Sequence, residues 1–393
     1  MMEPKIRFKG FEGEWKALSL DDCVNFLDSK RKPIEEGNRT KGIFPYYGAS
    51  GIVDYINDYI FDEELILLSE DGANITDRNY PVCFLAKGKY WVNNHAHVLK
   101  AKEGFINSFL CNAMERKDYT LYNTGMAMPK LNKEACKRIP VLHPSSIEQK
   151  AIATYFTSLD SQISAATSRL ASLKQMKAAS LQAMFPQEGE TVPKIRFKGF
   201  EEEWKKVKLN SFAKRVTRKN SHLESTLALT IASAHGLVSQ IDYFNNLVVG
   251  SNIRNYYLLK KGEFAYNKSY SNGYPFGSVK RLERYEQGIL STLYITFSID
   301  NSISSDYLTH FFDTNLWHKE VAERAAEGAR NHGLLNIGAN DFLDINIWKP
   351  ESKAEQQAIA SYFTSLDRQI SLQSQRLEKL KQIKSACLDK MFV

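Results

Sequence analysis

The feature that most constrains this chain is a segment of 38 residues that occurs twice. Residues 148–185 and 355–392 are identical at 24 of 38 aligned positions, and neither copy contains proline or glycine. Apolar residues recur along each copy at alternating intervals of four and three, which is the heptad pattern of a coiled-coil helix. A helix of this length measures roughly 57 Å at 1.5 Å per residue. The sequence therefore predicts two long and closely similar helices.

The apolar positions form one narrow seam along each predicted helix. The seam residues are Phe156, Leu159, Ile163, Leu170 and Leu173 in the first copy, and Phe363, Leu366, Ile370, Leu377 and Leu380 in the second. A seam this narrow suits a second helix better than a globular core. We therefore predict that the two helices pair antiparallel, with Gln373 as a polar interruption, and that their other faces seat further subunits. The alternative is that each helix packs on the surface of its own domain.

A second repeat precedes each helix at a distance. The nine residues PKIRFKGFE stand at 4–12 and again at 193–201, and Glu-Trp-Lys follows one residue later in both places. The stretches between the repeats, 17–146 and 206–353, show no extended similarity to each other. Two copies are too few for a solenoid, which needs three or more stacked repeats. A repeated framework around two different insertions indicates that one structural unit is used twice, on two different targets.

Both insertions are predicted to be α+β domains. In each, short β-like pieces separated by turn residues are followed by a helix, a loop and a short strand. The predicted strands are 43–48, 55–61, 65–73 and 81–101 in the first insertion, and 227–233, 246–250, 255–259, 262–270, 277–282 and 288–299 in the second. The helices predicted after them are 106–118 and 307–328. The common order predicts a shared topology despite the different sequences.

We therefore predict an α+β protein with a pseudo-twofold internal duplication. Two globular domains, 1–146 and 187–353, alternate with the two long helices, 147–186 and 354–393. A length of 393 residues exceeds one typical core, so two or more domains are expected. A hydrophobic content of 43% and a charged content of 25% are those of an ordinary globular protein.

Other properties bound the class of protein. The longest purely aliphatic run, 65–68, is too short to span a bilayer, and the N-terminus lacks the apolar core of a secretory signal. Five cysteines without a C-x-x-C pair favour reduced thiols in a cytoplasmic protein over a disulfide framework or a zinc site. A formal net charge of +7 permits binding to nucleic acid through release of counterions from phosphates, but does not require it.

Several loops are rich in Tyr, Asn, Ser, Gly and His, whose side chains can donate to and accept from base edges and phosphates. The alternative is that these residues form ordinary turns and capped strand ends. The candidate DNA-binding residues are Tyr46, Tyr47, Ser50, Asn93, Asn94, His95, Lys130, Asn267, Lys268, Ser269, Tyr270, Tyr274, Arg330, Asn331 and His332. Among them, Arg330 is the best candidate for bidentate recognition of a guanine.

The sequence shows no recognisable catalytic motif. The eleven prolines include no Pro-Pro pair, which excludes the N/D-P-P-Y/F loop of amino-methyltransferases, and there is no G-x-x-x-x-G-K-S/T. His95-x-His97 lacks a third ligand pattern and favours an alternating strand over a metal site. We therefore expect no catalytic residue and no metal site in this chain. A nuclease or methyltransferase acting alone is an alternative that these absences disfavour.

Taken together, the repeats and loops resemble the specificity subunit of type I restriction–modification systems. The resemblance covers the whole chain and includes the KIRF-GFE-EW openings, the EQ-AIA-YFTSLD-QI starts of both helices, and the stretches PYYGASGIVDYINDYIF, SEDGAN, WVNNHAHVL and GARNHGLLNI. It implies that the insertions are two target-recognition domains, each reading one half of an asymmetric, split DNA site. It also implies that the helices act as a ruler for the spacer between the halves.

The resemblance further implies partners and cofactors outside this chain. Double-stranded DNA would bind here together with two modification subunits, which hold S-adenosylmethionine and the methyl-transfer site. Restriction subunits would supply translocation and cleavage that depend on ATP and Mg. The chain itself would be non-catalytic, would hold no cofactor and would not contact a membrane. The alternative is a coiled-coil scaffold without DNA readout, which would not require two dissimilar domains rich in Tyr and Asn.

Overall fold

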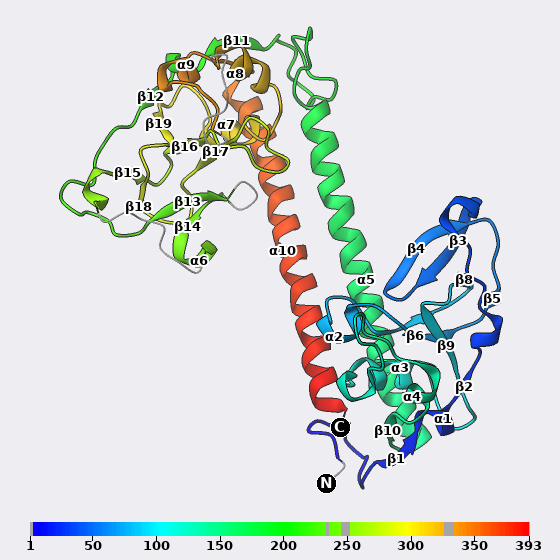
Figure 1. The fold of residues 1–393 in the computed structure, drawn as a ribbon. Helices are drawn as coiled ribbons and strands as arrows, with labels where there is room; N and C mark the ends of the chain where they lie inside the picture. Colours follow the sequence, from blue (N-terminus) through cyan, green and yellow to red (C-terminus); the bar gives the residue numbers. More distant parts are fainter. Residues whose placement is uncertain (1–2, 233–235, 245–251, 326–333, 393) are drawn as a thin grey trace. The chain divides into compact units, whose positions relative to one another are not determined.

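The computed structural model describes residues 3–232, 236–244, 252–325 and 334–392 (Figure 1). The chain divides into two compact units: unit 1 is Met1–Arg169 with Gln373–Val393, and unit 2 is Leu170–Leu372. Each unit joins one globular domain to the first part of one long helix and the last part of the other. These units differ from the predicted segments, because both helices contribute residues to both hydrophobic cores.

The two predicted long helices are confirmed. They are α5, Ser146–Ala183, and α10, Lys353–Met391. The hydroxyl groups of Ser145 and Ser352 accept from the backbone N–H groups of Glu148 and Glu355, each over 3.4 Å. Such serine caps satisfy donors that the first turn of a helix leaves unpaired. Among the helices that the structure describes, none is both long and apolar enough to cross a bilayer.

Within unit 1, the two long helices run antiparallel. Tyr155 Oη lies 3.4 Å from Cys387 Sγ, and further along α5 the Gln373 side-chain amide donates to the Ala166 carbonyl over 3.1 Å. As residue numbers rise along α5, the residue numbers of the contacting positions on α10 fall, which is the pattern of an antiparallel pair. Gln373, the polar interruption of the predicted seam, is thus satisfied by a backbone carbonyl.

Unit 2 shows the same helix pairing. Ser180 Oγ lies 2.9 Å from Tyr362 Oη, and Lys177 Nζ lies 2.7 Å from Asp367 Oδ1. The Ser180–Tyr362 pair repeats the Tyr–Cys pair of unit 1, since Ser180 aligns with Cys387 in the sequence repeat. The predicted antiparallel coiled coil and the internal duplication are therefore confirmed.

The ten predicted seam residues are all at least partly withdrawn from solvent. The buried ones are Phe156, Leu159, Leu173, Phe363 and Leu366, and the half-buried ones are Ile163, Leu170, Ile370, Leu377 and Leu380. Phe156 and Phe363 belong to the cores of the two units, with ring centroids 5.8 and 6.0 Å from those of Phe392 and Phe185. The seam thus continues into a domain core near the start of each helix.

In the described part of unit 1, the domain has two four-stranded sheets and a two-stranded ribbon. The sheet orders are β2-β9-β6-β7 and β4-β3-β8-β5, and β1 pairs with β10. The strands are β1 Lys16–Ser19, β2 Val24–Phe26, β3 Lys41–Gly48, β4 Gly51–Ile56, β5 Phe61–Asp62, β6 Leu65–Ser69, β7 Cys83–Ala86, β8 Lys89–Val92, β9 Ala96–Ala101 and β10 Pro140–His143. The helices are α1 Leu20–Cys23, α2 Asn74–Asp77, α3 Asn107–Glu115 and α4 Lys133–Lys137, with 3-10 turns η1 Asp28–Lys30, η2 Glu36–Asn38 and η3 Thr120–Tyr122.

Unit 2 has an equivalent central sheet, of order β12-β19-β16-β17. Its described strands are β11 Lys205–Lys208, β12 Ala213–Arg215, β13 Leu229–Ala232, β14 Gly236–Ser239, β15 Tyr257–Lys260, β16 Phe264–Asn267, β17 Ser278–Arg281, β18 Gln287–Leu290, β19 Ile295–Ile299 and β20 Asn346–Lys349. Its helices are α6 Gln240–Phe244, α7 Ser305–Phe311, α8 His318–Arg324 and α9 Ala339–Leu343, with 3-10 turns η4 Leu209–Ser211 and η5 Ile253–Asn255. The strand predicted over 246–250 lies outside the described residues.

The single helix predicted over 307–328 is wrong. A turn separates α7 from α8, and residues 326–328 lie outside the described part. Thr314 Oγ1 donates to the Phe311 carbonyl over 2.7 Å, and the Trp317 indole N–H donates to the Phe312 carbonyl over 3.2 Å. These local hydrogen bonds compete with the helical ladder. The burial of Trp317 in the core then fixes the turn.

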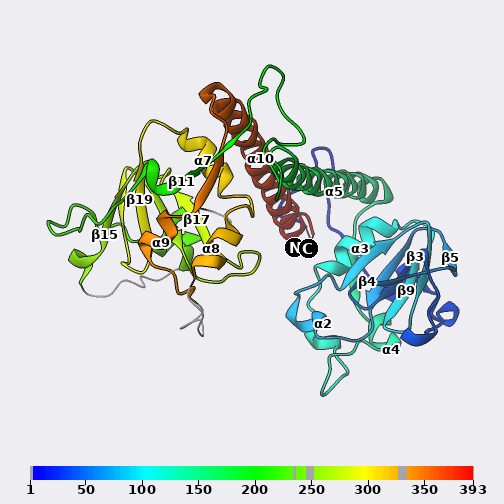
Figure 2. The ribbon, with the colours of Figure 1, turned by 90° about the horizontal axis from the view of Figure 1, so that it is seen from above.

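The two units share the topology of the central sheet and of the two-stranded ribbon, as the common order of elements predicts. The remaining strands differ: unit 1 has the sheet β4-β3-β8-β5, whereas the described part of unit 2 has the pairs β13–β14 and β15–β18. The ribbon β1–β10 of unit 1 corresponds to β11–β20 of unit 2, and α3 and α7 each follow the last strand of the central sheet. In unit 2, α7 and α8 lie beside the central sheet (Figure 2). Aromatic residues of α7 and of the turn before α8, including Tyr307, Phe311 and Trp317, share one core with Tyr266 and Phe297 of the sheet. The shared topology places corresponding loops at corresponding strand ends.

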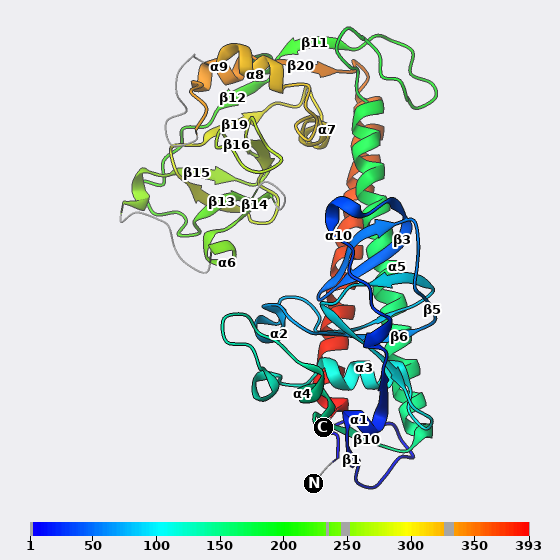
Figure 3. The same cartoon turned by 45° about the vertical axis from the view of Figure 1, so that its right-hand side comes forward.

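The repeated entry segment makes the same contact in each unit. The Ile6 N–H donates to the Lys390 carbonyl over 2.9 Å, and the Ile195 N–H donates to the Ala183 carbonyl over 2.8 Å. Lys390 and Ala183 are aligned positions near the ends of the two long helices. Figure 3 shows the entry segment of unit 1 beside the end of α10. PKIRFKGFE therefore occurs twice because each domain is tied to the end of a helix in the same way.

Candidate nucleic-acid interface

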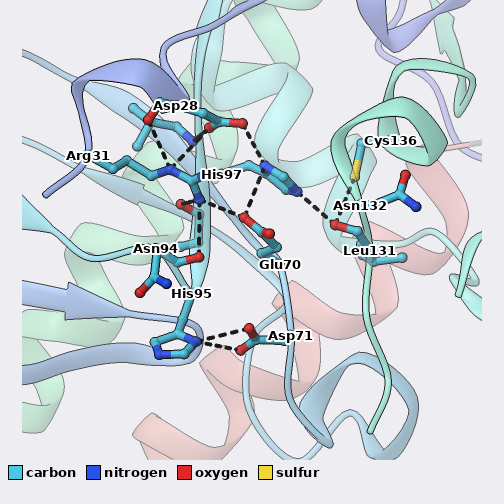
Figure 4. Close-up of polar contacts among 12 residues, drawn as sticks. Asp28, Arg31, Glu70, Asp71, Asn94, His95, His97, Leu131, Asn132 and Cys136 are labelled. Carbon is cyan, nitrogen blue, oxygen red and sulfur yellow. Dashed lines mark hydrogen bonds and ion pairs between the residues drawn. The ribbon is translucent and has the colours of Figure 1, made fainter. Parts of the chain in front are cut away.

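In unit 1, a loop of residues 123–131 is attached to the end of strand β6 (Figure 4). The Leu131 N–H donates to the Glu70 carbonyl over 2.7 Å. Asp71 and Lys130 form an isolated antiparallel bridge beside this bond. The structure thus places Lys130, predicted from sequence, next to residues that directly follow the central strand.

The predicted residues Asn93, Asn94 and His95 form the turn that leads into β9. The Asn93 side chain is buried, and its Oδ1 accepts from the His95 N–H over 2.8 Å. Asn94 and His95 are exposed, and His95 Nδ1 lies 2.9 Å from both carboxylate oxygens of Asp71. The Glu70 N–H donates to the His95 carbonyl over 2.9 Å. Asn94 and His95 therefore offer polar groups to solvent, whereas Asn93 supports the turn.

His97 lies beneath this surface, on β9. Its Nδ1 lies 2.8 Å from Asp28 Oδ2, and its Nε2 lies 2.7 Å from the Leu131 carbonyl oxygen (Figure 4). Burial alone would lower the pKa of His97, but the hydrogen bond with Asp28 and the contact with Cys136 raise it to about 10. Burial would likewise raise the pKa of Asp28, which the hydrogen bond with His97 holds below its ordinary value.

Glu70 connects two further cations to the same cluster. Arg31 Nη1 lies 2.7 Å from Glu70 Oε2 and donates to the Ala96 carbonyl over 2.9 Å. Lys130 Nζ lies 3.6 Å from Glu70 Oε1, and half of the lysine side chain is exposed. Arg31 thus fixes the start of β9, while Lys130 retains an ammonium group that can reach an anionic or base-edge acceptor.

The three predicted residues of the β3–β4 hairpin have different surroundings. Tyr46 is 1% exposed, and its hydroxyl accepts from the Ile34 N–H over 2.9 Å. Tyr47 is half-buried, with its ring 5.6 Å from that of Tyr90, and Ser50 is exposed in the turn after β3. A buried ring leaves no surface for a base, so Tyr46 supports the core and we do not include it in the candidate interface.

In unit 2, the predicted residues Asn267, Lys268 and Ser269 lie at the end of β16. The Leu335 N–H donates to the Lys268 carbonyl over 2.9 Å, and Ser269 forms an isolated bridge with Leu334. Asn267 Oδ1 accepts from the Ser269 N–H over 3.0 Å. These contacts repeat those of Glu70 and Asp71 in unit 1, so the same edge of the central sheet is built in both domains.

The other predicted residues of unit 2 differ in what the structure shows of them. Lys268 is half-buried, and its Nζ donates to the Ile337 carbonyl over 3.3 Å. Tyr270 is exposed. Tyr274 is half-buried, and its backbone N–H donates to the Ser271 carbonyl over 2.8 Å. Arg330, Asn331 and His332 lie outside the described residues and stay predictions from sequence.

The comparison with known proteins agrees with this construction. Residues 12–175 match the family described as type I restriction modification DNA specificity domain. The match covers less than half of the chain and shows a similarity to this family within unit 1. The matched residues contain both sheets of unit 1, the His97 cluster and the first part of α5.

Two similar proteins extend the comparison. Over 145 residues the chain is 35% identical to a putative type I restriction enzyme specificity subunit, S.HindORF215P, of Haemophilus influenzae; the alignment covers 37% of this chain and 37% of that protein. The crystal structure of the S subunit of a type I restriction-modification system from M. genitalium matches with a TM-score of 0.72 and 13% identity, over 100% of this chain and 99% of that one. At this identity, the structural match shows the fold alone.

Sequence reasoning missed the cluster of buried and half-buried residues that organises the domain of unit 1. Asp28 and Arg31 lie outside the quoted stretches, and Glu70 and His97 lie within SEDGAN and WVNNHAHVL without having been selected as a pair. His97 does lie on a strand, β9, as predicted. Asp28 and His97 are 69 positions apart in the sequence, and Glu70 and His97 are 27 positions apart. Only the sheet order β2-β9-β6 brings them together, so no local signal could have identified them.

A group in unit 2 has the composition of a metal site. His310, Asp313 and Asp367 each bring one possible ligand atom, and these atoms lie within 4.8 Å of one another. Lys177 Nζ lies 3.0 Å from Asp313 and 2.7 Å from Asp367, and Lys280 Nζ lies 2.9 Å from Asp313. Burial would raise the pKa of Asp313, but Lys280, His310 and Lys177 hold it far below its ordinary value. The lysines already supply the charge that the carboxylates require, so we assign no metal here.

Proposed function

We propose that this chain is the DNA sequence-recognition subunit of a type I restriction–modification complex, and that its two domains read the two halves of an asymmetric bipartite site. The observation that carries the proposal is that the two units present different side chains on one framework. Glu70 and Asp71 follow β6 where Lys268 and Ser269 follow β16, and the backbone contacts of the two pairs are the same.

Different polar groups on a common framework are what two unlike half-sites require. In the major groove, each base pair offers its own pattern of donors and acceptors, so surfaces with different polar side chains select different bases. Unit 1 exposes Asn94, His95 and Lys130 at its sheet edge, and unit 2 exposes Tyr270 near Ser269. The repeated frame would hold each domain in the complex, and the inserted domain would choose the half-site.

We further infer that the chain itself is non-catalytic. Two modification subunits would bind S-adenosylmethionine and transfer the methyl group, and restriction subunits would use ATP and Mg. The support for this division is that the match over residues 12–175 is to a DNA specificity domain, together with the lack of a catalytic motif in the sequence. The polar faces of α5 and α10, which lie opposite the seam, are the surfaces that we assign to these subunits.

A genome methylation map tests the proposal. The map of a host is compared before and after deletion of this gene, with the neighbouring genes intact and the modification subunit shown to be expressed. We expect the loss of one split motif, methylated on both strands, and its return when the wild-type gene is supplied. An unchanged map with the modification subunit present would contradict the proposal and favour a coiled-coil scaffold without DNA readout.

A domain exchange provides the matched control. Replacing residues 206–351 by the corresponding segment of another specificity subunit, with both long helices and the Ser352 cap retained, should change one half of the motif and leave the other half and the spacer as they were. A change in both halves would contradict the assignment of one half-site to each domain.

A further inference from the structure

His97 is held by two groups that can only accept hydrogen bonds. Asp28 Oδ2 faces its Nδ1 at 2.8 Å, and the Leu131 carbonyl oxygen faces its Nε2 at 2.7 Å. Asp28 is itself held, since its Oδ1 accepts from the Val98 N–H over 2.9 Å. A neutral imidazole has one donor and one acceptor, so this geometry requires a proton on both nitrogens. His97 is therefore a buried imidazolium that joins η1, β9 and the segment at Leu131.

The segment that His97 holds is the closing end of a compact loop. The Thr124 N–H donates to the Lys130 carbonyl over 2.7 Å, and Asn123 Oδ1 accepts from the Lys130 N–H over 2.8 Å. Gly125 allows the chain to fold back tightly, because a Cβ at this position would lie 1.8 Å from the Met128 carbonyl oxygen. The loop is thus internally closed, and its orientation depends on what holds its base.

Side chains at the tip of this loop are not part of a core. Met126 is fully exposed, Met128 is largely exposed, and Lys130 is half-exposed. Apolar tips and lysines of this kind contact the methyl groups, base edges and phosphates of a DNA groove. The base of the loop is fixed by the Leu131 N–H on the Glu70 carbonyl and by His97 on the Leu131 carbonyl.

We propose that His97 is a positioning residue for DNA reading by unit 1, which locks the loop 123–131 to the end of the central sheet so that Lys130 and the Met126–Met128 tip meet the half-site in one geometry. This inference rests on the proposed function. His97 does not touch the DNA; it acts through the Leu131 carbonyl.

Unit 2 supports the inference with a different clamp on the equivalent segment. The sheet register pairs Leu68 with His97 in unit 1 and Tyr266 with Ile295 in unit 2, so an isoleucine stands where the histidine would be. Lys268 supplies the cation instead, and its Nζ donates to the Ile337 carbonyl over 3.3 Å. Each domain therefore uses a buried or half-buried cation to hold the chain that returns to the sheet edge.

The test uses the full chain assembled with its modification subunits. Initial rates of methylation are measured on duplexes with the correct site and on duplexes with one base pair changed in either half-site. His97→Gln should reduce discrimination about tenfold, or about 1.4 kcal/mol, in one half-site only, because the base contact of that half-site is misplaced. Lys268→Gln is the matched variant, and it should reduce discrimination in the other half-site only.

Two further measurements separate positioning from folding. The double variant Asp28→Asn/His97→Gln replaces the buried ion pair by neutral amides of similar size, and it should fold while still losing discrimination in the same half-site. In the wild type, ¹⁵N NMR of the His97 ring should show protons on both nitrogens at pH 7.5. A folded variant that keeps full discrimination, or loses it equally in both half-sites, would overturn the role of His97. Failure of the proposed function would instead appear in the wild type, as a complex that discriminates at neither half-site.

Discussion

Arg7 and Glu148 form a bidentate ion pair in which the guanidinium Nε and Nη2 each lie 2.7 Å from one carboxylate oxygen. Arg7 belongs to the repeated entry segment, and Glu148 belongs to the first turn of α5. Arg196 and Glu355 form the same pair in unit 2, at 2.7 and 2.8 Å. The sequence repeat is therefore a repeat of contacts, and these contacts do not depend on the inserted domain.

The first prediction concerns this ion pair. Glu148→Gln should lower the free energy of unfolding of unit 1 by about 3 kcal/mol, because the half-buried guanidinium of Arg7 loses the buried carboxylate and keeps only the Glu12 and Gly13 carbonyls. Glu355→Gln should destabilise unit 2 by a similar amount, because Arg196 forms the same ion pair with Glu355 and the glutamine oxygen can still accept from the Trp204 indole N–H. Urea unfolding with hydrogen exchange resolved by unit measures both effects. Glu14→Gln, at an exposed position of the same segment, is the control, and a loss as small as that of the control would contradict the prediction.

The second prediction compares two aligned lysines. Lys177 of unit 2 lies with Lys280 on the half-buried Asp313, whose side chain is 17% exposed, whereas its counterpart Lys384 in unit 1 pairs with Asp160, whose side chain is 51% exposed. Asp313→Asn should lower the free energy of unfolding of unit 2 by about 3 kcal/mol, because two largely desolvated ammonium groups lose the carboxylate that they share. Asp160→Asn should cost less than about 1 kcal/mol, as surface pairs do. Equal losses in chemical denaturation of the two variants would refute this difference.

The third prediction is a dependence of stability on pH. The pKa of His97 is raised from 6.5 to about 10 in the folded chain, so the folded state holds a proton that the unfolded state releases. This contribution to stability is fully present below about pH 6.5 and is lost as the pH rises through about 10. Hydrogen exchange of amides near β9 should therefore give a lower opening free energy at pH 9.5 than at pH 6.5, after correction for intrinsic exchange rates.

The His97→Gln variant is the reference for this pH dependence. It should show no such loss of stability between pH 6.5 and 9.5, because glutamine does not titrate. Asp28 acts at the other end of the scale: its pKa is lowered, so its contribution is present above about pH 3.8 and is lost as the pH falls further. A wild type whose unit 1 is equally stable at pH 6.5 and 9.5 would show that His97 is not held as a cation.

The parts of the fold that sequence predicts are those with a local period. The intervals of four and three along 148–185 and 355–392 predict α5 and α10, because the side chains of one helix face recur at that spacing. The antiparallel pairing follows from the repeat, and Ser180–Tyr362 and Tyr155–Cys387 show it in atomic contacts. The prediction failed at 307–328, where tertiary burial of Trp317 overrides helix propensity.

The candidate site was only partly accessible to sequence reasoning. The prediction selected loop residues by composition. The structure places Asn94 and His95 at one sheet edge, beside Asp71 (Figure 4), and Asp71 bridges to Lys130. It could not distinguish the buried Tyr46 from them, because burial depends on residues distant in the chain. The His97–Leu131 contact joins residues 34 positions apart and leaves no pattern in the sequence. The sequence therefore identifies loops that carry exposed polar residues, but it does not identify the buried residues and long-range contacts that hold these loops in place.

The last prediction tests direct reading at the sheet edge. Lys130→Ala should reduce the binding free energy by about 1–3 kcal/mol, and this loss should depend on one base pair of one half-site. The reason is that the ammonium group of Lys130 is held near Glu70 on a fixed loop and can reach a base-edge acceptor. Arg330→Ala, at a position predicted from sequence alone, should act through the other half-site. Binding is measured on duplexes with single base-pair changes at several salt concentrations. A loss that is uniform across unrelated sequences, with the salt slope reduced by about one, would instead assign the residue to a phosphate.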